Sequence, residues 1–394
     1  MDKVNVGIVG TGARGVFAFG KPLSQNYADR VNVLALCDKN EVRLGIAKDM
    51  VGGDVQTFAD YDKFLAQPNL DAVFVATPDF THAALTIAAL EAGKHVYCEK
   101  PMATQAEDCR KMIDAANKST ATLQVGLNLR YTRIMQELID VVRRGDIGEV
   151  VMATCIDTLE GASHFARWHR KKEYSGGILL QKGTHTLDLL NWIVDDVPVK
   201  VAAYGGRDVF KAREECRGWR CLDCQEAATC FYHRNVGEAR DGLYAKFYLE
   251  AEKLDGYIVD RCIFDPDADI YDNASVIVEY ESGKRTTYNL SLFGAEHDRK
   301  FTVTGSEGKI EASLTKREIV LVRRHTKDVI KHALQADTGG HGGGDARLMD
   351  DFLDLVQHGR KPLADADAGM WSTLAGLAAE RSIETGQEVA LADL

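Results

Sequence analysis

The chain has 394 residues, a length that favours two or three domains with substantial cores. Hydrophobic residues make up 45% and charged residues 27%, and there are only 7 prolines, which argues against a disordered or collagen-like chain. With 48 basic and 59 acidic side chains the net charge is −11, so no general attraction to nucleic acid or anionic lipid follows. Any anionic ligand must therefore be bound locally.

The start of the chain has neither the basic leader nor the apolar stretch that is typical of a secretory signal. No segment approaches the ~20 consecutive apolar residues that a membrane-spanning helix needs. We therefore expect a cytoplasmic protein without a membrane partner. Its 9 cysteines are then expected to be thiols or metal ligands.

The first third of the chain alternates short apolar runs with amphipathic stretches, the pattern of strand-helix-strand units around a parallel sheet. The apolar runs cover residues 4–10, 31–38, 70–78, 94–101 and 121–128. This pattern predicts an α/β, doubly wound (Rossmann) domain over residues 1–128.

A different pattern begins after residue 128. Predicted strands, most of them with alternating apolar and polar residues, lie at 149–158, 274–293, 299–313 and 317–324. Predicted helices lie at 130–144, 184–194, 345–358 and 368–385. We expect residues 129–394 to form an α+β domain with an open, mainly antiparallel sheet, and with a Cys-rich insertion near 207–272.

The first predicted strand ends in a G-x-G-x-x-G motif and leads into a helix, the context in which this motif binds a dinucleotide. The motif consists of Gly10, Thr11, Gly12, Ala13, Arg14 and Gly15. Its glycines permit a tight turn, close approach of the backbone to a pyrophosphate, and close packing of helix on strand. The N–H groups at the start of the helix are then available to the phosphates.

Asp38 ends the second predicted strand, where a carboxylate can accept hydrogen bonds from the adenosine ribose. NAD is the expected cofactor, because a 2′-phosphate would meet this negative charge. Lys39 and Arg14 could offset the charge, which keeps NADP open as an alternative.

The chain resembles, over nearly its whole length, the glucose-fructose oxidoreductase, inositol dehydrogenase and MocA (Gfo/Idh/MocA) family. The motifs that carry the resemblance are GTGARG, VATPDFTH, CEKPMA and SGG…KGTHTLD. The resemblance implies an NAD(P)-dependent oxidoreductase acting on a sugar, sugar acid or cyclitol. It also implies a cofactor cleft formed by Thr77, Pro78, His82, Glu99, Lys100 and Asn128.

Oxidation of a secondary alcohol removes the hydroxyl proton as hydride leaves carbon, so a base must lie beside the nicotinamide. Lys100 is a candidate, since an amine near the charged nicotinamide has a lowered pKa and can act as base or as hydrogen-bond donor. His185 and Asp188 match an H-x-x-D element of the family on a helix, where they share one face. His185 can accept or relay the proton, and Asp188 can orient a sugar hydroxyl.

The position four residues before His185, where many relatives have Asp, is Gln181 in this chain. Gln is not a base, so the proton path of those relatives is in doubt. The neighbouring Lys182 is a candidate for a second amine or for a contact with an anionic group, and a solvated side chain is an equal alternative. Substrate contacts are expected from Arg167 and Trp168, which suit a carboxylate and a sugar ring, and from His341 in a glycine-rich segment.

Four cysteines lie close together in the insertion, with spacing C-x4-C-x2-C-x5-C. Such a set can hold a structural Zn²⁺ ion, and unligated thiols are the main alternative. The four are Cys216, Cys221, Cys224 and Cys230.

The preferred hypothesis is thus an NAD-dependent dehydrogenase of a sugar, sugar acid or cyclitol, with Lys100 and His185 at the reacting carbon. Two alternatives remain open: a redox-neutral glycoside-cleaving enzyme that uses bound NAD transiently, and a non-catalytic NAD-dependent sensor. The resemblance further implies a homodimer or homotetramer formed through the open sheet of the second domain. No nucleic-acid partner is expected.

Overall fold

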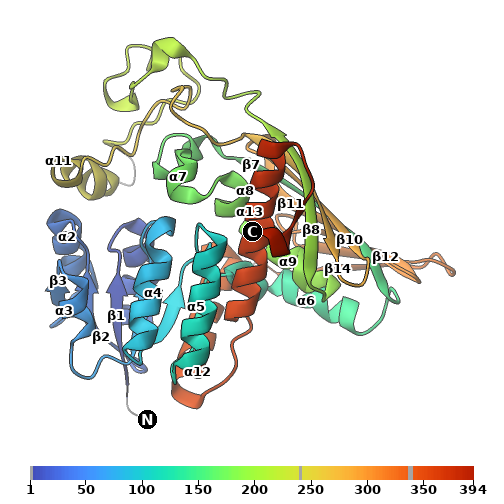
Figure 1. Ribbon diagram of the computed structural model, residues 1–394, viewed down its shortest axis with the longest axis horizontal. Coiled ribbons are helices and arrows are strands. Elements are labelled where there is room, and N and C mark those ends of the chain that lie inside the picture. Colours follow the sequence, from blue (N-terminus) through green and yellow to red (C-terminus); the bar gives the residue numbers. More distant parts are fainter. Residues whose placement is uncertain (1–2, 239–241, 336–339) are drawn as a thin grey trace.

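The computed structural model describes residues 3–238, 242–335 and 340–394, and it has two domains, each built on one sheet (Figure 1). The first sheet is parallel, with strand order β3-β2-β1-β4-β5-β6. Its strands are β1 (Val4–Val9), β2 (Val31–Cys37), β3 (Gln56–Phe58), β4 (Ala72–Val75), β5 (His95–Cys98) and β6 (Leu123–Val125). The strand order reverses between β1 and β4, which is where a doubly wound sheet binds its ligand.

Helices connect the strands of the first sheet, as the amphipathic stretches predict, and α4 and α5 pack against each other. The helices are α1 (Lys21–Asn26), α2 (Glu41–Val51), α3 (Tyr61–Leu65), α4 (His82–Glu91) and α5 (Ala106–Lys118). The predicted Rossmann domain is therefore confirmed. In the described part of the chain, no helix has both the length and the hydrophobicity to cross a membrane.

The helix α12 (Gly344–His358) packs on the first sheet, although the predicted boundary assigned residues 129–394 to the second domain. The Phe352 ring lies 5.0 Å from that of Phe74 on β4 and 6.0 Å from that of Tyr97 on β5. Strand β4 is buried along its whole length, so its apolar surface needs a cover. A late segment of the chain supplies this cover, and a local sequence pattern does not reveal such a contact.

The second sheet is mixed and has strand order β14-β13-β12-β11-β7-β10-β9-β8-β15. Only β7 and β10 pair in parallel within it, and the other described pairs are antiparallel. The strands are β7 (Val150–Glu160), β8 (Pro198–Gly206), β9 (Asn273–Tyr280), β10 (Arg285–Ser291), β11 (Phe293–Gly305), β12 (Gly308–Ser313), β13 (Glu318–Arg323), β14 (Val329–Ala333) and β15 (Val389–Ala390). This arrangement agrees with the predicted open, mainly antiparallel sheet.

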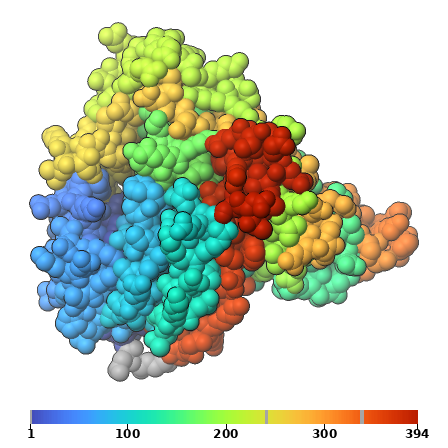
Figure 2. Space-filling model, viewed as in Figure 1, coloured from blue at the N-terminus to red at the C-terminus, as the bar shows by residue number. Residues whose placement is uncertain are grey.

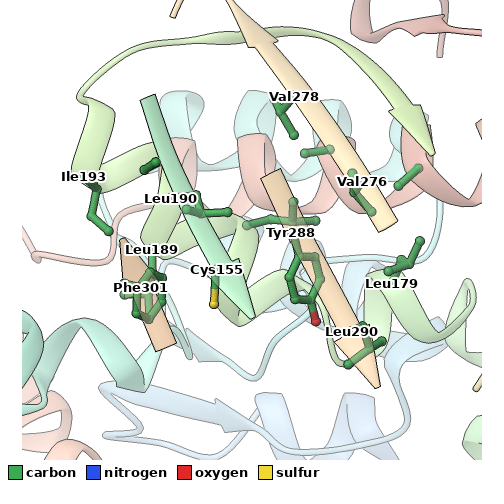
Figure 3. Packing of buried hydrophobic residues seen from close by; sticks show 14 of the residues in the cluster. Cys155, Leu179, Leu189, Leu190, Ile193, Val276, Val278, Tyr288, Leu290 and Phe301 are labelled. Carbon is green, nitrogen blue, oxygen red and sulfur yellow. The ribbon is translucent and has the colours of Figure 1, made fainter. Parts of the chain in front are cut away.

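One face of the second sheet is covered by helices, and its core includes Leu189, Leu190 and Ile193 of α9, packed on strand residues such as Cys155 and Tyr288 (Figure 3). The helices of this domain are α6 (Arg133–Arg143), α7 (Lys172–Ser175), α8 (Ile178–Gln181), α9 (Thr184–Val194) and α13 (Ala366–Thr385). The other face remains open and carries several exposed apolar side chains. Among them are Met152, Ile156, Tyr204 and Ile277.

The insertion between β8 and β9 contains the short helices α10 (Leu243–Ala245) and α11 (Glu252–Asp255) and reaches back to the first domain. The Asn40 side chain, which caps α2, donates to the Ala251 carbonyl over 2.9 Å and to Asp255 over 2.8 Å. Arg43 of α2 forms an ion pair with Asp255. Figure 2 shows this olive-coloured segment resting on the blue N-terminal domain.

Candidate active site

The glycine motif forms the loop between β1 and the helical turn η1 (Gly15–Gly20). Gly10 has φ +91°, which a residue with a side chain rarely adopts, and a Cβ on Gly15 would lie 1.9 Å from the Gly10 carbonyl oxygen. At Gly12 the nearest atom to an added Cβ is the Tyr248 hydroxyl, at 4.0 Å, so the backbone there is open. The loop therefore fits a dinucleotide pyrophosphate.

Asp38 lies immediately after β2 and faces the glycine loop. Its Oδ2 accepts hydrogen bonds from the Thr11 N–H over 2.8 Å and from the Thr11 hydroxyl over 3.1 Å. The neighbouring Lys39 is exposed. Arg43 approaches Asp38 to 4.0 Å but is ion-paired with Asp255. The carboxylate thus lies where the sequence placed the ribose contact.

Arg14 is held by two carboxylates from different parts of the chain. Its Nε lies 2.7 Å from Glu99, and its Nη2 lies 3.0 Å from Asp345 at the start of α12. Asp345 also accepts from Asn128 Nδ2 over 2.7 Å and lies 2.9 Å from His341 Nδ1. Burial opposes ionisation of Asp345, but the bond from His341 and the charge of Arg14 hold its pKa well below the usual range.

His82 joins two loops that border the cleft. Its Nδ1 lies 2.8 Å from the Pro101 carbonyl and its Nε2 lies 3.0 Å from the Thr77 carbonyl, and the ring is fully buried. Because both nitrogens face backbone carbonyls, we assign His82 to fixing the loops rather than to touching the cofactor. Thr77 and Pro78, at the end of β4, are more accessible than His82.

Lys100 follows β5, and its Nζ donates to the Gln181 carbonyl over 2.7 Å. Burial lowers its pKa, an effect that the carboxylates of Asp79 and Glu99 oppose. Asp79 is itself buried, which raises its pKa, and its Oδ2 has no hydrogen-bond partner within the described residues. The charges of Lys100 and Asp79 thus influence each other's pKa. The sequence indicated only Lys100 as a candidate site residue.

His185 and Lys182 come from α9 and from the turn before it. Burial lowers the pKa of His185, and the charges of Lys100, Arg299 and Lys182 lower it further, so the ring is neutral at pH 7. Burial lowers the pKa of Lys182 to about 7, with Arg299 acting in the same direction. The His185 and His341 rings lie 6.4 Å apart. The structure therefore gathers Lys100, Lys182, His185 and His341 at one site.

Asp188 lies apart from this group, paired with a buried arginine. Both of its carboxylate oxygens accept hydrogen bonds from Arg130, at 2.7 to 3.1 Å. The two side chains are almost completely buried. The guanidinium thus contacts both oxygens, and the expected contact of Asp188 with a sugar hydroxyl stays a prediction.

Arg167 and Trp168 lie in the segment that joins β7 to α8. The Arg167 guanidinium lies 5.7 Å from the Tyr244 ring centre, and the Trp168 ring lies 4.1 Å from that of His169. His169 in turn lies 5.4 Å from His164, and both imidazoles have pKa values lowered by burial and by nearby cations. The charge of Lys100 contributes to both shifts, which connects this segment to the lysine site.

Buried polar atoms without a partner among the described residues gather around this cleft. Most buried polar groups in folded proteins are hydrogen-bonded, so such a concentration indicates groups that a ligand satisfies. The side chains concerned are those of Asp79, Asn128, His164, Arg167, His169, Gln181 and His185.

The predicted four-cysteine zinc site is not supported. Across residues 3–238, 242–335 and 340–394 no group of three or more His, Cys, Asp or Glu side chains is arranged to hold a metal ion. The buried Cys216 is hydrogen-bonded to Cys262 instead, and burial raises the pKa of Cys216 to about 12. The cysteines of the insertion are free thiols.

The sequence missed several charged groups of the cleft. Asp345 had a local signal, since it follows the glycine-rich segment and begins a predicted helix. Asp79 follows the cleft residues Thr77 and Pro78 directly. Asp157 and Arg299 had no local signal in the sequence, because they meet only through the pairing of β7 with β11.

The first domain is a doubly wound sheet with an open glycine loop. It is joined to a mixed sheet, whose helix α9 and the turn before it place His185 and Lys182 near Lys100. This combination defines a two-domain dinucleotide-binding oxidoreductase. The chain belongs to the Gfo/Idh/MocA oxidoreductase family. Residues 4–127 match its "NAD-binding Rossmann fold", and residues 139–391 match its "C-terminal alpha/beta domain". The resemblance read from the motifs is thereby confirmed.

Several known proteins are similar to this chain over nearly its whole length. The Bacillus subtilis protein YteT is 28% identical over 99% of this chain and 98% of its own. Myo-inositol 2-dehydrogenase of Thermotoga maritima is 24% identical over 99% of both chains. A solved structure of levoglucosan dehydrogenase in complex with NADH has a TM-score of 0.77 at 18% identity, covering 99% of each chain. At that identity the structural likeness shows the shared fold.

Proposed function

We propose that this protein is an NAD-dependent dehydrogenase that oxidises a secondary alcohol of a sugar, sugar acid or cyclitol. The observation that supports this most directly is the convergence of Lys100 and the neutral His185 beside a loop that fits a dinucleotide. Relatives named as myo-inositol 2-dehydrogenase and levoglucosan dehydrogenase support the same class of substrate. No contact among the described residues favours the glycoside-cleaving or sensor alternatives.

The two candidate catalytic side chains have complementary tasks. A dinucleotide held at the glycine loop and Asp38 would supply a nicotinamide as the hydride acceptor. Lys100 Nζ donates a hydrogen bond to the reacting oxygen and stabilises the negative charge that develops there. His185, which is neutral, accepts the hydroxyl proton at a ring nitrogen, and its Nδ1 is buried without a partner in the described structure. Asp79 positions Lys100 by attracting its ammonium group.

The dinucleotide is expected to lie along the glycine loop, with its ribose at Asp38. The negative charge of Asp38 opposes a 2′-phosphate. Arg14, the arginine of the glycine motif, is held by Glu99 and Asp345. These contacts support NAD over NADP. Asn128 and Thr77 are proposed to face the nicotinamide side.

The experiment that tests this proposal mixes the purified protein with NAD⁺ or NADP⁺ and a panel of sugars, sugar acids and cyclitols. Formation of reduced nicotinamide is followed by its absorbance, and NADH binding is followed separately by fluorescence. We expect NADH to bind and at least one polyol to be oxidised with preference for NAD⁺. A protein that binds neither NADH nor NADPH would contradict the proposal.

We also propose a homo-oligomer formed through the open face of the second sheet. The exposed apolar residues on this face support it, because large exposed apolar patches mark interaction sites.

A further inference from the structure

A cavity of about 440 Å³ adjoins the candidate active site and is lined mainly by the second domain. The charged side chains among the described residues that line it are all basic, although the net charge of the protein is −11. No carboxylate occurs among the described residues that line it. The basic side chains and imidazoles of the lining are Arg133, Lys182, His297, Arg299, Arg317 and His341.

Two of these cations, Lys182 and Arg299, have few hydrogen bonds or opposite charges around them in the cavity. Lys182 has no hydrogen-bond or ion-pair partner within the described residues, although its side chain is largely buried. Arg299 uses only its Nε, which donates to Asp157 over 2.8 Å, and its two terminal nitrogens have no described partner. Asp157 also accepts from Thr186 and Tyr288, so it is shared among several donors.

Such an arrangement is unfavourable without a ligand. Removing a charge from water costs free energy unless an opposite charge or several hydrogen bonds replace the water. Burial lowers the pKa of Lys182, and the charge of Arg299 lowers it further. A bound anion would reverse both effects and would occupy the free terminal nitrogens of Arg299 in the bidentate geometry that guanidinium groups favour. A neutral polyol would leave Lys182 without an opposite charge and the terminal nitrogens of Arg299 without an anionic partner.

The cation pair is adjacent to the reacting groups. Lys100 Nζ bonds to the carbonyl of Gln181, the residue before Lys182, and His185 follows three residues after it. The charge of Arg299 influences the pKa values of both Lys100 and His185. One substrate could therefore reach the reacting groups and the cation pair at the same time.

On the basis of the proposed function, we propose that the substrate of this dehydrogenase carries an oxyanion, a carboxylate or a phosphate, which Lys182 and Arg299 bind while a hydroxyl of the same molecule lies at Lys100 and His185. The class of substrate is thus an anionic sugar rather than a neutral sugar or cyclitol. His341 and the outer arginines of the cavity add positive potential that attracts such a ligand.

Calorimetric binding to the NADH-loaded protein tests this proposal. The probes are D-glucuronate, D-galacturonate and glucose 6-phosphate, compared with D-glucose and D-galactose. We expect at least one anionic probe to bind about tenfold more tightly than its neutral counterpart, and added salt to weaken that binding. The carboxylate and phosphate probes distinguish the two sources of the oxyanion. If no anionic probe binds more tightly than its neutral counterpart, the proposal is overturned.

Variants identify the residues responsible. Lys182→Met should weaken the anionic probe by about tenfold or more, and by more than it weakens the matching neutral sugar, whereas Lys331→Met, on the exposed β14, should change neither. Arg299→Lys is a second variant that keeps a charge beside Asp157 but removes the planar fork. Unchanged anion binding in both Lys182→Met and Arg299→Lys would overturn the proposal.

The binding panel is repeated without NADH. A protein that fails to bind the dinucleotide contradicts the proposed function, whereas the comparison of anionic and neutral sugars still tests the cation pair. Turnover of neutral sugars alone would leave the dehydrogenase proposal intact and contradict this one.

Discussion

Lys100 is the side chain on which the proposed chemistry depends most directly, since its Nζ is held at the cleft by the Gln181 carbonyl. Replacement by Met keeps most of the volume and removes the hydrogen-bond donor. We expect Lys100→Met to lower turnover by about 100-fold or more while NADH affinity changes by less than about threefold. Initial rates and NADH fluorescence titration measure the two quantities.

The matched control for this variant is Lys118→Met, an exposed lysine at the end of α5, which should match the unmodified protein in both measurements. Turnover that persists in Lys100→Met would exclude Lys100 as the donor to the reacting oxygen.

Lys182 makes anion binding depend on pH. Its pKa of about 7 means that the ammonium form, which binds an anion, is lost as the pH rises through 7. We therefore expect anion affinity to fall by up to about tenfold per pH unit above pH 7, and to be nearly constant below it. The titratable and charged groups around Lys182 that shape this profile are Arg299, Asp157, Lys100, His164 and His185.

Calorimetry between pH 6 and 9 measures the profile with a probe whose own ionisation is complete over this range. In Lys182→Met the dependence should disappear. A slope of the same size in that variant would assign the titration to another group.

The individual site residues could be predicted from the sequence to the extent that each lies in a short motif. The glycine loop, Asp38, Lys100 and His185 each follow a predicted strand or lie on a predicted helix, so their surroundings were implied by local pattern. Arg299 is distant in sequence from Lys182, and the register of β11 on β7 places it opposite Asp157. The pairing of Asp188 with Arg130 likewise had no local signal, because Arg130 lies 58 residues away.

At the scale of elements, the insertion contacts the glycine loop and the start of α2. Asp255 binds both Asn40 and Arg43 of α2, and the Tyr248 hydroxyl lies 3.4 Å from the Ala13 nitrogen. The insertion therefore contacts both the glycine loop and α2, and we expect it to retain a bound dinucleotide. We expect Asp255→Ala to raise the dissociation rate of NADH about fivefold to thirtyfold, since the variant loses contacts with two residues and each lost hydrogen bond contributes about 1 kcal/mol.

Stopped-flow displacement of NADH measures this rate. Glu250→Ala, a change of an exposed carboxylate just before α11, is the matched control and should leave it unchanged. Equal rates in Asp255→Ala and the unmodified protein would mean that the insertion does not retain the cofactor.

The elements themselves were predicted well where the pattern was long and regular. The helix predicted at 184–194 coincides with α9, and the strand predicted at 149–158 is shifted only slightly from β7. The short strand β3 and the edge strand β14 were missed, since β3 has three residues and β14 is almost wholly exposed. The sequence does not indicate that α12 crosses to the first sheet, because an apolar helix face does not specify its partner.

For the whole molecule, the open face of the second sheet predicts an oligomer. Ile277 lies on β9 and is 52% exposed, and its cross-strand neighbour on β10 is Thr287. A carboxylate placed here would be desolvated in an interface, at a cost of more than about 2 kcal/mol. Light scattering after size exclusion should show an oligomer for the unmodified protein and a single chain for Ile277→Glu.

Leu254→Glu introduces the same charge at an exposed apolar position of the insertion and should leave the mass unchanged. An unmodified protein with the mass of one chain would contradict the proposed oligomer.

The packing of α12 has a consequence for how the molecule is made. Phe352 and its neighbours complete the core of the first sheet, and Asp345 completes the contacts of Arg14 in the glycine loop. During synthesis, the nucleotide-binding domain therefore remains without part of its core until α12, which ends at His358 of the 394 residues, has been added. A fragment that stops at residue 128 would expose Phe74 and leave Arg14 with a single carboxylate, so this half is not a transferable module.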